Sequence, residues 1–65
     1  MQRWEYLTLG VVENEVWWVD GVNQPVRSRR NIFDALYQAG DDGWELVSHS
    51  ENGSWSTFTF KRPKE

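Results

Sequence analysis

The stretch Gly40-Asp41-Asp42-Gly43-Trp44-Glu45-Leu46-Val47 constrains the fold more than any other part of the chain. Glycine enters left-handed backbone conformations without the steric penalty of a Cβ atom, so we expect Gly40 and Gly43 to end a helix. The four residues that follow alternate as in a strand, with Trp44 and Leu46 on one face. Because the connection is short, the helix is expected to pack back on this strand.

The chain has 65 residues, enough for a single small domain spanning residues 1–65 with a limited core. It contains no cysteine and one histidine, so we expect neither a disulfide nor a structural zinc site. Five tryptophans, three phenylalanines and two tyrosines are available for packing. Large rings bury much apolar area. We therefore expect aromatic packing and self-association to stabilise the fold.

Alternating β-branched and aromatic residues predict strands over residues 3–12, 16–19, 44–50 and 55–61. The dipeptides Asp20-Gly21 and Asn52-Gly53 are typical of type I′ hairpin turns, which need positive φ at both central positions. Residues 22–26 are expected to pair only briefly after the first turn, because Pro25 lacks an amide hydrogen. Gly10 indicates a bulge or the close approach of another backbone.

Apolar residues recur at helical spacing between the two hairpins, at Ile32, Phe33, Leu36 and Ala39. Ser28 is the expected N-cap of this helix. A helix of about three turns is not stable alone in water, so it must lie on the sheet. The sequence thus predicts an α+β fold: a four-stranded, mostly antiparallel sheet in the order β-β-α-β-β, with one helix on one face.

A single helix covers one face of a four-stranded sheet and leaves the other face open. We expect Glu5 and Glu45 to point to solvent, which fixes the faces of their strands. The residues then expected under the helix are Trp4, Tyr6, Trp44, Leu46, Phe58 and Phe60. The residues expected on the open face are Leu7, Leu9, Val47 and Trp55. An apolar patch of this kind indicates an interface, so we expect a homo-oligomer, most simply a dimer, formed through the open face.

Arg27, Arg29 and Arg30 form the basic cluster of the chain, close in sequence to Trp17 and Trp18. Neighbouring residues of a strand point to opposite faces, so one of the two tryptophans is expected in the core and the other at the surface. Arginines on phosphates and rings on bases would bind a single-stranded nucleic acid, which is the alternative function. The net charge of −3 and the carboxylates that can pair with these arginines disfavour a nucleic-acid partner.

From the other polar residues we expect no catalytic site, no cofactor-binding site and no metal site. His49 lies between two serines, but neighbours on a strand point to opposite faces, so no nucleophile lies beside it as a base would require. Asp41, Asp42 and Glu45 lack the surrounding oxygen ligands of a Ca²⁺ loop. We expect a non-enzymatic interaction or accessory module that binds itself or another protein.

No apolar run approaches the ~20 residues needed to span a bilayer. The amino end also lacks a basic segment followed by an apolar leader. We therefore expect a cytoplasmic protein with no membrane partner.

Three blocks of the sequence occur together in a recognisable order: Trp4-Glu5-Tyr6, Gly40-x-x-Gly43-Trp44-Glu45-Leu46-Val47 and Lys61-Arg62-Pro63. In this order they resemble a family of small bacterial and phage proteins catalogued as domain of unknown function 4177. The resemblance runs over nearly the whole chain, apart from the aromatic segment at residues 16–26. It implies a compact α+β domain and assigns no activity.

Overall fold

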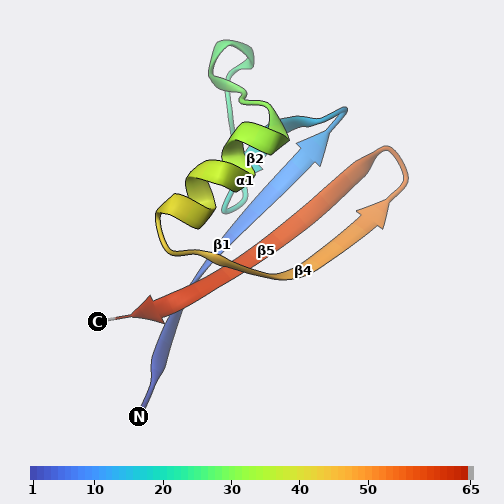
Figure 1. Ribbon diagram of the computed structural model, residues 1–65. Coiled ribbons are helices and arrows are strands. Elements are labelled where there is room, and N and C mark those ends of the chain that lie inside the picture. The colour runs from blue at the N-terminus through green and yellow to red at the C-terminus, as the bar shows by residue number, and fades with distance from the viewer. Residues whose placement is uncertain (65) are drawn as a thin grey trace.

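The computed structural model describes residues 1–64, which form one α-helix and one five-stranded sheet (Figure 1). The strands are β1 (Arg3–Val12), β2 (Glu15–Val19), β3 (Val22–Asn23), β4 (Glu45–Asn52) and β5 (Trp55–Lys64). A 3₁₀ turn, η1 (Val26–Ser28), and the helix α1 (Ile32–Asp41) connect β3 to β4. All strand pairs are antiparallel, in the order β3-β2-β1-β5-β4.

The predicted α+β class with one helix is confirmed, but the sheet has five strands rather than four. The additional strand, β3, follows the Asp20-Gly21 turn, whose φ angles of 50° and 82° suit a type I′ hairpin. At the last hairpin, Asn52 stays in β4 opposite Trp55, and the turn is Gly53-Ser54. Gly53 has a φ of 68°, so positive φ at the first central position alone makes this a type II′ turn.

Asn31, not Ser28, caps the start of α1. The Asn31 side-chain oxygen accepts a hydrogen bond from the Phe33 amide at 2.8 Å. Ser28 lies earlier, in η1, which the prediction from sequence missed. The 3₁₀ turn and the residues after it separate Ser28 from the first helical turn.

The predicted helix end at Gly43 is confirmed. Gly43 has a φ of 86°, its amide donates to the Gly40 carbonyl at 3.0 Å, and the Trp44 amide donates to the Ala39 carbonyl at 2.9 Å. These two bonds form a Schellman motif, which satisfies carbonyls that the last turn leaves unpaired. Gly40 itself lies inside α1, in its last turn. The motif turns the chain directly from α1 into β4.

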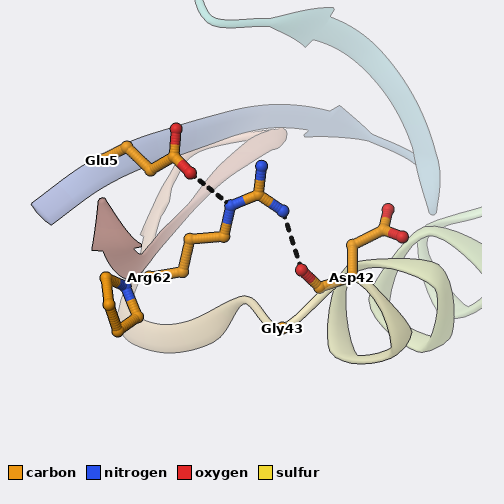
Figure 2. A pocket seen from close by; sticks show the side chains of 5 residues that line it. Glu5, Asp42, Gly43 and Arg62 are labelled. Atoms are coloured by element: carbon orange, nitrogen blue, oxygen red, sulfur yellow. Dashed lines mark hydrogen bonds and ion pairs between the residues drawn. The ribbon is translucent and has the colours of Figure 1, made fainter. Parts of the chain in front are cut away.

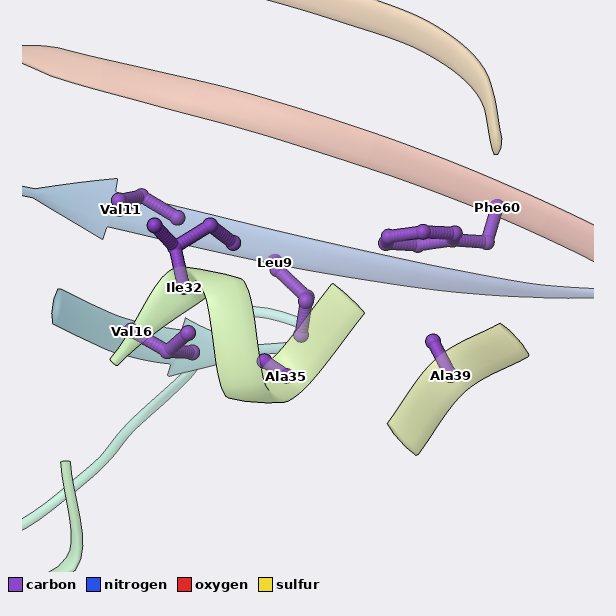
Figure 3. Close-up of a cluster of buried hydrophobic side chains, with 7 residues drawn as sticks. All are labelled: Leu9, Val11, Val16, Ile32, Ala35, Ala39 and Phe60. Atoms are coloured by element: carbon purple, nitrogen blue, oxygen red, sulfur yellow. The ribbon is translucent and has the colours of Figure 1, made fainter. Parts of the chain in front are cut away.

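The hydrophobic core lies between α1 and the strands β1, β2 and β5 (Figure 3). Its buried members are Leu9, Val11, Val16, Ile32, Ala35, Ala39 and Phe60. Phe58 and Trp44 pack against this core, so the predicted core positions of Phe58, Phe60 and Trp44 are confirmed. Residues opposite each other on paired strands share a face, and Leu9 and Leu7 lie opposite Phe58 and Phe60. The prediction that both leucines lie on the open face is therefore wrong.

The position of the Glu5 side chain explains why the two faces of β1 were assigned wrongly from the sequence. Its carboxylate lies on the helix side of the sheet, beyond the carboxyl end of α1, where Arg62 Nε binds Oε1 at 2.6 Å. A carboxylate with such a partner does not mark the open face. Trp4 and Tyr6, predicted to lie under the helix, consequently point to the open face.

The strand β4 lies at the edge of the sheet, beyond the reach of α1 (Figure 1). Leu46 lies opposite Phe60 and so faces the helix side as predicted, yet it is 47% exposed. Val47 is the additional residue of a β-bulge between Leu46 and Ser48. All eight residues of β4 are exposed.

Candidate functional site

The helix α1 covers its side of the sheet unequally. Successive helical residues are rotated by about 100°, so the buried Ile32, Ala35 and Ala39 define the face toward the sheet. One flank of the helix is apolar and consists of Leu36, Phe33 and Tyr37. The other flank is polar and consists of Asp34, Gln38 and Asp41.

The polar flank faces β2. The Arg30 guanidinium, from the segment before α1, donates to the Gln38 side-chain oxygen. Both residues line a small cavity together with Val19 of β2. The apolar flank therefore faces β5 and β4, where Leu36 and Phe58 both pack against the core.

Apolar groups continue outward on this side of the sheet. Phe33 is 58% exposed and Tyr37 is 76% exposed. The His49 imidazole of β4 stacks on the Phe58 ring, with centroids 4.2 Å apart and planes 9° from parallel. Together these residues form what we call the helix-side surface: Phe33, Leu36, Tyr37, Leu46, His49 and Phe58.

On the open face, three tryptophans gather at the end of the sheet formed by the β1–β2 and β4–β5 turns. The ring centroids of Trp17 and Trp18 are 5.8 Å apart. Those of Trp18 and Trp55 are 6.5 Å apart, and the second pair meets edge to face at 63°. With Val12 and Ser54 the three rings line a cavity of about 450 Å³, which we call the tryptophan pocket.

Two features of the backbone build this pocket. Gly10 lies against Trp18, where an added Cβ would come within 2.8 Å of the ring atom Cε3. A bulge at Gly10 and Val11, as predicted, makes Trp17 the additional residue of β2, between the paired residues Val16 and Trp18. Trp17 and Trp18 consequently line the same cavity, so the prediction that one ring points to each face is wrong.

The predicted arginine cluster is divided in the structure. The Arg29 guanidinium lies 3.8 Å from the Trp17 ring centroid, and its Nε donates to the Gln24 carbonyl at 3.1 Å. Arg30 is turned toward α1 through its bond to Gln38. Arg27 is exposed in η1. Only Arg29 is thus brought against Trp17.

A second cavity, also of about 450 Å³, lies at the carboxyl end of α1 (Figure 2). Its lining includes Glu5, Gly43 and Arg62. Besides its ion pair with Glu5, Arg62 donates from Nη1 to the Asp42 carbonyl at 2.7 Å and stacks 4.1 Å from the Trp44 ring centroid. A cation at a helix carboxyl end is favourable for the helix dipole. Through these contacts Arg62, a residue of β5, connects the carboxyl end of α1 to β1.

The remaining polar candidates lie apart. His49 Nε2 lies 3.9 Å from a Glu51 carboxylate oxygen, and both side chains are largely exposed. Within residues 1–64, no group of three or more carboxylate, histidine or cysteine side chains is placed to hold a metal ion.

Of the four predicted interface residues, two are accessible. Trp55 lies on the open face, 40% exposed, and Val47 is 44% exposed at the β4 bulge, whereas Leu7 and Leu9 lie under α1. The tryptophan pocket as a unit was not predicted. A glycine in β1 opposite a tryptophan was the available signal for it, because Gly10 gives Trp18 room to lie over the sheet.

No helix among residues 1–64 combines the length and apolar character needed to cross a bilayer. Comparisons with protein-family models, curated proteins and solved structures give no match. The resemblance to the domain of unknown function 4177 family stays a prediction from the sequence.

Proposed function

We propose that the protein is a non-enzymatic interaction module that self-associates as a dimer through the helix-side surface. The observation that carries the proposal is the position of the apolar flank of α1. Phe33 and Tyr37 lie on the flank that faces the uncovered β4, yet their own sheet leaves them 58% and 76% exposed. Exposed aromatic side chains next to an uncovered strand favour a docking surface.

The extent of the exposed surface supports this proposal. The chain exposes 4821 Å², about 500 Å² more than a monomer of 7.7 kDa typically does. Its radius of gyration is 12.0 Å, against about 10.7 Å for a compact domain of this length. A stable interface commonly buries about 800 Å² on each partner. A second copy would therefore remove the excess.

A two-fold arrangement fits the shape of the molecule. The helix stands above one half of the sheet, and β4 with part of β5 forms the uncovered half. If two copies face each other, α1 of each copy would lie over the uncovered half of the other. Such a contact uses the same surface twice and closes at two subunits.

The proposal does not include catalysis. Two of the three charged side chains at the second cavity are engaged, because Glu5 and Arg62 pair with each other and Arg62 also donates to the Asp42 backbone carbonyl. Single-stranded nucleic-acid binding by Arg27, Arg29 and Arg30 with Trp17 is the alternative proposal. Its support is limited to the stacking of Arg29 on Trp17.

The test is the molar mass in solution by light scattering, over a dilution series to low micromolar protein. We expect a mass near twice 7.7 kDa for the unaltered chain. Tyr37→Glu should raise the dimer dissociation constant at least about tenfold, because a desolvated carboxylate would enter the contact twice. Tyr6→Glu is the matched control, since Tyr6 is also largely exposed but lies on the open face.

Two results would contradict the proposal. One is a monomer at every concentration. The other is a dimer that Tyr6→Glu dissociates and Tyr37→Glu does not, which would place the contact on the open face.

A further inference from the structure

The tryptophan pocket is a second surface, on the opposite side of the sheet from the helix-side surface. A dimer formed through the helix-side surface leaves this pocket accessible. We propose that the pocket binds a small ligand that carries a quaternary ammonium group, with Trp18 and Trp55 as the rings that contact the cation.

The pattern of cations on the five tryptophans points to these two rings. Arg29 lies 3.8 Å from the Trp17 ring centroid. Lys61 Nζ lies 4.2 Å from that of Trp4, and Arg62 lies 4.1 Å from that of Trp44. Within residues 1–64, Trp18 and Trp55 have no such partner. The chain thus places its own cations on three of the five tryptophans and leaves Trp18 and Trp55, two of the three rings that line the pocket, without one.

The charge around the pocket is complementary to a cation. Glu15 lies opposite Val12 across the β1–β2 pair, so its carboxylate is on the same face of the sheet as the pocket. Glu13 follows Val12 in the turn. Neither glutamate has an ion-pair partner within residues 1–64. Arg29, which stacks on Trp17 and donates to the Gln24 carbonyl, adds one positive charge beside the pocket against the two glutamates.

The shape of the pocket suits an alkylated cation. Trp18 and Trp55 meet at 63° with centroids 6.5 Å apart, so two ring systems line different walls. A cation is attracted to the face of a tryptophan within about 6 Å of its centroid. Methyl groups on the nitrogen fit an apolar lining better than a hydrated primary ammonium does, because less water must be removed. The volume of about 450 Å³ accommodates a small ligand.

The test is a titration of the whole chain with choline, followed by the five indole N–H signals in ¹H–¹⁵N spectra. The matched ligand is 3,3-dimethyl-1-butanol, which has the same shape without the charge. We expect choline to shift the Trp18 and Trp55 signals with saturation and to bind about tenfold more tightly than the neutral alcohol.

Variants separate the pocket from the other aromatic end of the same face. Trp55→Leu should weaken choline binding about tenfold, whereas Trp4→Leu should leave it unchanged. Glu15→Gln retains the side-chain shape, so it should weaken binding a few-fold without altering the fold. The same titration of Tyr37→Glu should give unchanged binding, which keeps this proposal independent of dimer formation.

Equal binding of choline and the neutral alcohol would overturn the proposal, as would shifts confined to Trp4. A short oligothymidylate that shifts the Trp17, Trp18 and Trp55 signals at low salt, where choline does not, would also overturn it. That outcome would support the nucleic-acid alternative, with affinity that falls steeply as salt rises.

Discussion

Two glycines three positions apart should respond in opposite ways to the same substitution. Gly43 has a φ of 86° and ends α1, whereas Gly40 lies within the last helical turn and has no positive φ. An added Cβ meets no atom within 4 Å at either position. Replacement of each by alanine therefore changes backbone preference and leaves packing within the subunit untouched.

The expected magnitudes follow from these conformations. A left-handed backbone costs a residue with a Cβ about 1–2 kcal/mol, part of which the lower entropy of the unfolded alanine chain offsets. We expect Gly43→Ala to lower the free energy of unfolding by about 1 kcal/mol. Gly40→Ala should raise it by up to about 1 kcal/mol, because alanine is the better helix former. A gap of about 2 kcal/mol corresponds to roughly 8–16 °C between the two melting temperatures for a domain of this size.

The assay is urea unfolding followed by far-ultraviolet circular dichroism, with a thermal scan of each variant. Measurements at two protein concentrations separate intrinsic stability from any stability that dimer formation adds. If Gly43→Ala leaves the free energy of unfolding unchanged or raises it, the assignment of a left-handed conformation to Gly43 at the end of α1 is wrong. If both substitutions destabilise equally, the assignment of Gly40 to the helix interior is wrong.

Three further substitutions test the start of α1 and the pocket. Asn31→Ala should lower the free energy of unfolding in urea by about 1 kcal/mol, because the N-cap of α1 is lost. Ser28→Ala should change this free energy by only a few tenths of a kcal/mol. If Ser28→Ala is the more destabilising of the two, the assigned cap is wrong. Gly10→Ala should lower the free energy of unfolding by about 1–3 kcal/mol and alter the near-ultraviolet circular dichroism of the tryptophans, because the added Cβ would clash with Trp18. If both the stability and the spectrum are unchanged, the Trp18 ring does not lie against Gly10.

Local signals in the sequence predicted the parts of the fold that depend on nearby residues. The helix end at Gly43 and the hairpin at Asp20-Gly21 require unusual backbone angles, which the residue types at those positions favour. The core positions of Phe58 and Phe60 follow from strand alternation. Each of these features needs only a few neighbouring residues to specify it.

The face of β1 could not be predicted in the same way, because both of its faces carry apolar residues. Alternation then gives two equivalent assignments, and a single misplaced residue reverses them. The choice depends on Arg62, which lies 57 positions from Glu5 in the sequence and binds its carboxylate on the helix side of the sheet. A long-range ion pair of this kind has no local signal.

The candidate site could not be predicted from the regular alternation of side chains along a strand, because it is formed by departures from that pattern. The bulge at Gly10 places Trp17 out of the regular sequence of pairs, so three tryptophans meet at one cavity. The arginines separate because Arg30 bonds to Gln38 while Arg29 stacks on Trp17. Their closeness in sequence therefore did not predict a common surface.

The central claim is that a second copy covers the helix-side surface. The most direct measurement is an isotope-filtered nuclear Overhauser experiment on a mixture of labelled and unlabelled chains, which detects only contacts between copies. We predict contacts between the rings of Phe33 or Tyr37 in one copy and the Leu46 methyl groups of the other. Contacts between copies that involve Trp4 or Tyr6 instead, or no contacts at protein concentrations where the mass is that of a dimer, would contradict the claim.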